Sequence, residues 1–157
     1  MTPPALDVDL LRGGLPEYGE DALPPFPSFV EGERLRFLVK ADRDTRIAVL
    51  EIAPTGEVHE SAFDEARGVV VHGWRPRRVP SDAFPPLDLK GPVGAHAWVI
   101  LSCPLGGGMP RIPEGSIHLI PPPSTRWSEE DVGAIEEATG CRARVKPYRI
   151  EPAGHDD

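Results

Sequence analysis

The sequence predicts a mainly β protein: a β-sandwich of about six to eight short strands with one C-terminal helix at about residues 129–139. Three observations support this prediction. Apolar residues alternate or run together in short segments. Between those segments fall many of the 20 prolines and 16 glycines, as is typical of turns. A single helix signal occurs late in the chain. We place one domain at 7–150, between a flexible N-terminus (1–6) and a flexible tail (151–157), because 157 residues are enough for one core.

The predicted strands follow in order along the chain. Residues 7–12 form a short strand that ends at two glycines, and residues 34–40 largely alternate apolar with charged side chains, as a half-buried strand does. Residues 47–52 and 95–103 are nearly continuous apolar runs, which favours strands buried on both faces. Short strands are expected at 58–61 and 69–71, a short strand or an extended edge at 116–120, and a final strand at 141–150.

The helix signal consists of an N-cap residue and a terminal glycine. Ser128 is followed by two glutamates, whose charges suit the positive end of a helix dipole. Gly140 stands where a C′ residue belongs. The helix is therefore expected to run from about Glu129 to Thr139.

The acidic cluster at 41–45, ADRDT, lies between two predicted strands. Two carboxylates two residues apart can bind a divalent cation, but the further ligands and the glycine of a calcium loop are missing. Thr45 also follows Asp44 directly, which does not fit a phosphotransfer nucleophile motif. Asp is common at turns because its side chain accepts hydrogen bonds from backbone amides. We therefore predict a hairpin connection here and no metal site.

Two proline-rich segments, 15–33 and 73–92, are predicted to be connecting loops. The second contains the densest basic cluster of the chain, WRPRR. This cluster could bind an acidic partner or a phosphate through its arginines, or be cut by a peptidase that prefers arginine. The alternative is a solvated loop whose charges balance acidic neighbours. The candidate residues of this partner-binding or cleavage loop are Trp74, Arg75, Arg77 and Arg78.

The two cysteines and five histidines show no zinc-ligand spacing. Cys103 ends an apolar strand that also contains His96, but seven residues along a strand put the two on opposite faces, about 23 Å apart. A cysteine-dependent hydrolase would therefore need His59, His72 or His118 to approach Cys103 in space. Because free cysteine is among the most buried residue types, a structural thiol is the alternative. We predict no catalytic residue, no metal and no cofactor.

Composition narrows the class of partner. A net charge of −8 argues against a nucleic-acid or anionic-membrane binder, since both need a basic face. No apolar run reaches the ~18 residues of a membrane span, and the N-terminus lacks the basic and apolar regions of a signal peptide. Two cysteines are too few for a disulfide-built secreted scaffold. We therefore expect a cytoplasmic protein.

Three blocks of the sequence resemble a bacterial domain family of unknown function. GERLRFLVKADRDTRIAVLEIAPTGEVHE (32–60) resembles the opening of the family's domain, and VGAHAWVILSCP (93–104) resembles a later strand. SEEDVGAIEEATGC (128–141) is similar to the closing helix and cysteine that precede the final strand. The resemblance covers about residues 7–150 and rests on patterns of strands and turns.

This resemblance implies a β-sandwich module that often accompanies zinc-binding anti-sigma segments or caspase-like peptidases. The family offers no established catalytic residues to carry over, and this sequence contains neither the zinc-binding segment nor the membrane helix. We therefore expect a non-enzymatic regulatory or protein-interaction module of a bacterial signalling or defence pathway, anti-sigma-like or peptidase-associated. Its protein partner would be a caspase-like peptidase or a sigma-factor system. The alternative function is a cysteine-dependent hydrolase that uses Cys103.

Overall fold

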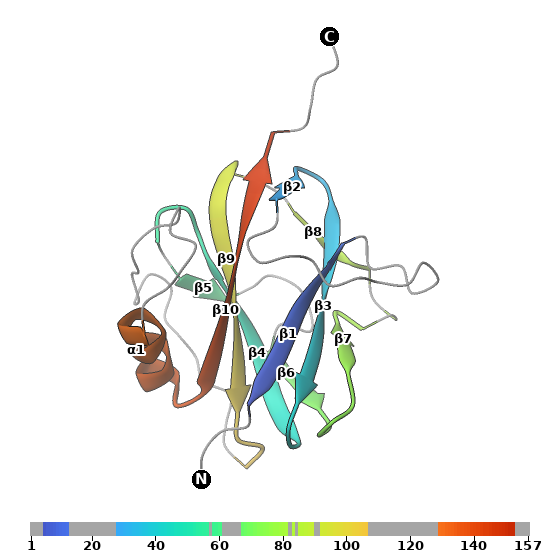
Figure 1. Ribbon diagram of the computed structural model, residues 1–157, viewed down its shortest axis with the longest axis vertical. Coiled ribbons are helices and arrows are strands. Elements are labelled where there is room, and N and C mark those ends of the chain that lie inside the picture. Colours follow the sequence, from blue (N-terminus) through green and yellow to red (C-terminus); the bar gives the residue numbers. More distant parts are fainter. Residues whose placement is uncertain are drawn as a thin grey trace.

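The computed structural model has two β-sheets packed face to face, with the helix α1 (Glu129–Thr139) beside the larger sheet (Figure 1). It describes residues 5–12, 28–56, 58–60, 67–81, 83, 85–89, 92–106 and 129–152. The predicted mainly β architecture and the C-terminal helix are confirmed. The expected strand at 116–120 and the N-cap Ser128 lie outside the described residues.

The four-stranded sheet is built around β3 (Arg34–Ala41). Along one edge β3 pairs with β1 (Leu6–Arg12), which begins one residue before the predicted start of the domain. The other edge pairs with two short strands, β7 (Arg77–Val79) and β8 (Leu87–Asp88). All three pairings are antiparallel, so alternate residues of β3 face the second sheet.

The six-stranded sheet has β9 (Gly94–Cys103) at its centre, between β4 (Thr45–Ile52) and β10 (Arg142–Glu151). Every residue of β9 after Gly94 is buried, which confirms the predicted central strand. Three short strands complete the sheet: one pairs parallel with the end of β10, and two pair with β4. They are β2 (Ser28–Val30), which falls within a segment predicted to be a loop, β5 (Val58–Glu60) and β6 (Arg67–Val71).

The predicted hairpin at 41–45 is wrong, because β3 and β4 belong to different sheets. The chain instead crosses from one sheet to the other here. A hairpin and such a crossing have the same apolar pattern, because in both arrangements each strand keeps one face toward the core. The Asp side chains do accept backbone amides, but from distant segments. Asp42 Oδ1 accepts from the Ala5 amide at 3.0 Å, and Asp44 Oδ1 accepts from the Gly73 amide at 2.7 Å. These bonds tie the corner to the start of β1 and to the β6–β7 turn.

Aromatic side chains fill the space between the two sheets. Trp98 of β9 is stacked on Tyr148 of β10 with ring centroids 5.3 Å apart, and it meets Phe37 of β3 edge to face at 5.4 Å. Tyr148 also contacts Phe29 of β2 edge-on and stacks with His96. Burial raises the pKa of Tyr148 well above its ordinary value, so this phenol stays neutral inside the core.

The opposite face of the six-stranded sheet carries a second core, on which α1 packs. Ile135 of α1 is fully buried there. Gly140 ends the helix with a φ of 71°, and its amide donates to the Glu136 carbonyl at 2.8 Å, which confirms the predicted C′ glycine. Cys141 follows and forms a disulfide with Cys103, their Cα atoms being 4.6 Å apart. The disulfide ties the α1–β10 connection to the end of the central strand.

The segment 73–92 is not the single long loop that its prolines predict, since it contains β7 and β8. Arg36 of β3 is only 5% exposed and holds this segment. Its guanidinium Nη1 donates to the carbonyls of Pro80 and Ser81 at 2.6 and 2.8 Å. The prolines of this segment do not prevent strand formation, because Pro76 and Pro80 lie just outside the three-residue strand β7 and leave its pairing intact.

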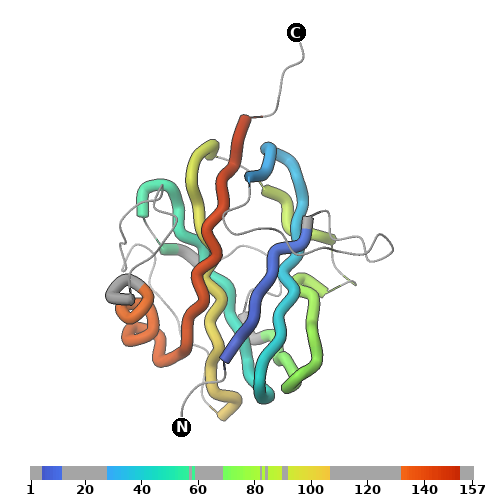
Figure 2. Tube along the Cα trace, in the orientation of Figure 1, coloured from blue at the N-terminus to red at the C-terminus, as the bar shows by residue number. Residues whose placement is uncertain are grey.

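The first and last strands, β1 and β10, lie side by side (Figure 2). The side chain of Arg144 in β10 crosses between them, and its Nε donates to the Leu6 carbonyl at 2.9 Å. β1 pairs with β3 alone among the described strands, so its second edge is open. Arg144 therefore satisfies one backbone acceptor on that edge.

His96 gives the fold a defined pH dependence. Its side chain is buried, with Nε2 2.6 Å from the Pro92 carbonyl oxygen. Burial lowers the pKa of His96 below its ordinary value of 6.5. The unfolded chain therefore binds a proton at this site more readily than the folded one does, and stability is expected to fall as pH drops below about 6.5.

Urea unfolding measured from neutral to mildly acidic pH would test this expectation. In His96→Gln the loss of stability on acidification should be smaller than in the wild-type protein. Identical pH profiles for wild type and His96→Gln would contradict the assignment.

Candidate protein-binding surface

The turn between β6 and β7 places a large aromatic side chain in solvent. Trp74 is 67% exposed and has a φ of 63°, in the left-handed region that costs a side-chain-bearing residue roughly 1–2 kcal/mol. The Arg75 amide donates to the His72 carbonyl at 3.1 Å and closes a four-residue turn. A positive φ at the third position of such a turn normally calls for glycine or asparagine. Strain of this kind is typical of functional sites.

Hydrogen bonds from the corner of the sandwich hold the turn. The Trp74 amide donates to the Ala41 carbonyl at 2.8 Å, and the Gly73 amide donates to Asp44 Oδ1. This second bond lowers the pKa of Asp44, so its carboxylate stays charged at neutral pH. A Cβ at residue 73 would lie 3.0 Å from the Cα of Arg43, a tight contact that favours glycine there. The exposed ring is therefore presented by a fixed backbone.

A positively charged hollow of about 400 Å³ lies beside the turn. We call it the cationic hollow. Arg75 is exposed, whereas Arg77 and Arg78 are half-buried, and Arg77 Nη1 donates to the Val70 carbonyl at 3.0 Å. The lining residues are His72, Arg75, Pro76, Arg77, Arg78 and Ser81.

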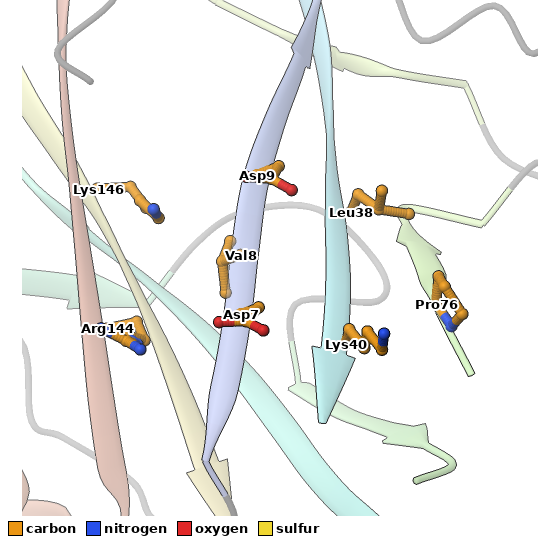
Figure 3. A pocket seen from close by; sticks show the side chains of 8 residues that line it. All are labelled: Asp7, Val8, Asp9, Leu38, Lys40, Pro76, Arg144 and Lys146. Carbon is orange, nitrogen blue, oxygen red and sulfur yellow. The ribbon is translucent and has the colours of Figure 1, made fainter. Parts of the chain in front are cut away.

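A groove of about 440 Å³ adjoins the cationic hollow, and Pro76 lines both (Figure 3). We call it the mixed-charge groove. Basic side chains of β3 and β10 lie on either side of two carboxylates of β1. Lys40 also connects the groove to the turn, since its Nζ lies 5.6 Å from the centroid of the Trp74 ring, within range of a cation–π contact. The groove is lined by Asp7, Val8, Asp9, Leu38, Lys40, Pro76, Arg144 and Lys146.

The structure does not place the four predicted residues in one loop. Trp74 and Arg75 lie in the exposed turn, whereas Arg77 and Arg78 belong to β7 and pair with β3. The sequence did not indicate that Lys40 joins them. Its exposure could be read from the alternation along β3, but its proximity to Trp74 depends on how the chain turns between the sheets.

Cys103 has no free thiol, so the sequence-based alternatives of a catalytic thiol and a structural thiol are both wrong. Its sulfur is bonded to that of Cys141, the only other cysteine of the chain. Both residues are buried. Nucleophilic catalysis by cysteine needs a thiolate, so the cysteine-dependent hydrolase loses its nucleophile in this structure.

Comparison of the chain with protein-family models, with curated proteins and with solved structures found no match. Among the residues that the structure describes, no helix is long and apolar enough to cross a membrane. The resemblance to the bacterial domain family stays a prediction, and what the surface around Trp74 binds has to be inferred from its own residues.

Proposed function

We propose that this protein is a non-enzymatic protein-interaction module and that Trp74 anchors its partner. The observation that carries the proposal is the 67% exposure of Trp74 on a turn with a left-handed backbone. Tryptophan and arginine are the residue types enriched at binding hot spots, and Arg75 follows Trp74 directly. A tryptophan that contributes little to the core, yet is held in place by backbone hydrogen bonds, is well suited to contact a partner.

The surface around Trp74 suits a partner segment that is polar and extended. The cationic hollow and the mixed-charge groove meet at Pro76, so one segment can lie across both. Charge complementarity of this kind mainly provides specificity and fast association. The basic side chains also stand out against the net charge of −8 of the whole chain, so acidic partner groups are steered toward this surface.

The pathway is proposed on the resemblance alone. A regulatory module of a bacterial signalling or defence pathway, anti-sigma-like or peptidase-associated, would bind a caspase-like peptidase or a sigma-factor system. The acidic net charge argues against a nucleic acid or an anionic membrane as partner. The cytoplasmic location stays a prediction from the sequence, and the disulfide between Cys103 and Cys141 favours an oxidising compartment instead.

Trp74→Gly is expected to weaken partner binding strongly and leave the fold intact. Removing a hot-spot tryptophan costs about 2 kcal/mol or more, which corresponds to roughly 30-fold weaker binding. Glycine adopts a φ of 63° without strain, so the unfolding temperature should stay the same or rise. The partner would be captured from the host on the tagged protein, identified by mass spectrometry, purified, and titrated against both forms by calorimetry.

Leu105→Ala provides the matched control for this experiment. Leu105 is another exposed apolar residue, 42% exposed, and it follows β9 outside the surface around Trp74. This variant should bind the purified partner as tightly as the wild type. A partner that binds Trp74→Gly with unchanged affinity would show that Trp74 is not the anchor.

A variant of the proposal makes the segment 75–78 the substrate of a partner peptidase. Arg75 is accessible in the turn, but Arg77 and Arg78 are paired in β7, and a strand must leave its sheet before a peptidase can bind it as an extended chain. Cleavage of the folded protein should therefore be slow after Arg77 and Arg78. Intact-mass analysis after incubation with the candidate peptidase tests this variant, which fails if a control substrate is cut and this protein is not.

A further inference from the structure

We infer that the open edge of β1 binds an extended segment of the protein partner as an added strand, in which basic and acidic residues alternate. The inference rests on the proposed function, because it takes the occupant of the edge to be the partner. It concerns the backbone of β1 and the mixed-charge groove, and not the Trp74 ring. The edge can therefore be tested with peptides on the purified protein.

The backbone of β1 has hydrogen-bonding groups on its open side. The Leu6 carbonyl accepts from Arg144 of β10 on that side. Because the backbone groups of successive residues point alternately to the two sides of a strand, the amides and carbonyls of Val8 and Leu10 lie on the same side as the Leu6 carbonyl. No described strand pairs with β1 there. An edge with such groups is a template for another strand.

Space for an added strand lies between β1 and β10. The Arg144 bond joins the two strands at the start of β1, and they diverge toward its end (Figure 2). The mixed-charge groove reaches into this space, since residues of both strands line it. Val8 is among them, although its side chain is buried. The groove therefore gives an extended chain access to the middle of the edge.

The outward face of β1 selects a basic residue. Asp7 and Asp9 are exposed on this face and both line the groove. In the register with β3, Asp7 lies opposite Lys40, whereas Asp9 lies opposite the apolar Leu38. A lysine or arginine next to Asp9 on an added strand would form a favourable cross-strand pair. The net charge of −8 also attracts a basic segment to the protein.

The inner face of the edge selects acidic residues between the basic ones. Arg144 and Lys146 share the face of β10 that carries the core residues Tyr148 and Ile150, because side chains alternate along a strand. The side chains of Arg144 and Lys146 point toward β1 (Figure 3). They would meet the inward side chains of a strand added to β1, where acidic residues are complementary in charge.

The same carboxylates disfavour a second copy of this chain as the occupant. Antiparallel pairing of two β1 strands about Val8 would place Asp7 of each copy opposite Asp9 of the other. Pairing about Asp9 would bring two Asp9 carboxylates together. Like charges directly opposite each other destabilise a sheet, and charged residues on edge strands prevent such association. A partner strand with lysine or arginine at these positions meets no such repulsion.

Amide hydrogen exchange measured by NMR tests the state of the edge. In the free protein, the amides of Val8 and Leu10 should exchange at least about tenfold faster than those of Asp7 and Asp9, which face β3. Protection of Val8 and Leu10 at every protein concentration would show that the edge is already covered, and would overturn the inference. Protection that grows with protein concentration would also overturn it, since the occupant would then be a second copy.

The probe for binding is a capped peptide with the seven-residue length of β1, in which lysine and glutamate alternate. At millimolar concentration it should shift the amide signals of β1 saturably and protect the amides of Val8 and Leu10 from exchange. A peptide of the same composition, with its lysines and glutamates in two blocks, should bind at least about threefold more weakly. Equal binding by the block peptide, or no protection by the alternating one, would overturn the inference.

Two methylated peptides separate backbone pairing from attraction between charges. Both have the alternating sequence, but one carries N-methyl groups on its glutamates and the other on its lysines. Only one of these two sets of amides faces β1 in an added strand. One methylated peptide should therefore bind at least about tenfold more weakly than the unmodified peptide, since its hydrogen bonds to β1 are lost. Undiminished binding by both would overturn the inference.

Charge-reversal variants assign the binding to the groove. Asp9→Lys should weaken binding of the alternating peptide at least about fivefold, because it replaces an attraction by a repulsion. Glu137→Lys is the matched control, because it changes the net charge equally at an exposed position of α1, and it should bind like the wild type. Both residues are exposed, so both variants should fold. Unchanged affinity in Asp9→Lys, or an equal loss in both variants, would overturn the inference.

The Trp74→Gly variant separates this inference from the proposed function. It should bind the alternating peptide like the wild type while binding the purified partner more weakly. If no peptide binds but partner affinity still depends on Trp74, only the added-strand inference fails. If the peptide binds and partner affinity does not depend on Trp74, only the anchor role of Trp74 fails.

Discussion

Replacing Cys103 and Cys141 together by alanine is expected to lower the free energy of unfolding by about 4 kcal/mol. The two cysteines are separated by 38 residues in the sequence, and closing a loop of this length lowers the conformational entropy of the unfolded chain by an amount worth about 4 kcal/mol. Both are buried in the core on which α1 packs. Alanine suits that apolar site better than serine, which would bring in a buried hydroxyl group.

Urea unfolding with and without a reducing agent measures this contribution. The wild type should lose stability in the reducing agent, whereas the double alanine variant should show the same midpoint in both conditions. A wild-type midpoint that reduction does not shift would contradict the expected contribution. Alkylation of free thiols before purification, followed by intact-mass analysis, reports the state of the bond in the host. Two alkylated cysteines would show that the disulfide is not formed in the host.

Elements whose residues interact locally could be predicted from the sequence. The helix Glu129–Thr139 is where its acidic first turn and Gly140 indicate, because a helix is determined by contacts within a few residues. β3 and β9 are also found where the apolar pattern places them. In each case a short stretch of the chain contains the whole signal.

Pairing between distant segments could not be predicted in the same way. Alternation along β3 and the apolar run of β4 fit a hairpin as well as they fit two strands that face each other across a core. The structure has the second arrangement, so the 41–45 connection is a corner. The Cys103–Cys141 bond escaped prediction for a related reason, since two isolated cysteines give no framework of spacings and β10 first has to pair with β9.

The candidate site shows the same division between local and distant signals. The basic cluster at 74–78 attracts attention in the sequence, and residues 75–78 line one hollow in the structure. That Trp74 would be exposed could not be derived, because a tryptophan in a proline-rich segment is as readily placed in a core. Its exposure follows from the left-handed turn and from the bonds that the Ala41 carbonyl and the Asp44 carboxylate accept. Those partners lie about thirty positions earlier in the chain, beyond the reach of a local pattern.

Trp98→Ala should cost about 3–5 kcal/mol of unfolding free energy, the range for truncating a large buried aromatic residue. Trp98 is 1% exposed, is stacked on Tyr148 with an interplanar angle of 7°, and meets Phe37 edge to face. It comes from the central strand of one sheet and touches the central strand of the other. Alanine would leave a cavity between the sheets that rigid strands on both sides cannot close.

Trp98→Phe and Trp74→Gly are the controls for this measurement. The first keeps an aromatic ring in the core, and the second removes an exposed tryptophan. The buried indole nitrogen of Trp98 has no hydrogen-bond partner in the described part of the chain. Replacing Trp98 by phenylalanine therefore removes volume but no hydrogen bond. The loss of unfolding free energy in Trp98→Phe should be well below that in Trp98→Ala. Trp74→Gly removes a tryptophan that is mostly in solvent, and should leave the urea midpoint unchanged or raise it. If Trp98→Ala unfolded at the wild-type urea midpoint, the packing of Trp98 against Phe37 would not be the main contact between the sheets. The expected results would instead show two roles for one residue type: Trp98 stabilises the sandwich from inside, whereas Trp74 stays exposed for contact with a partner.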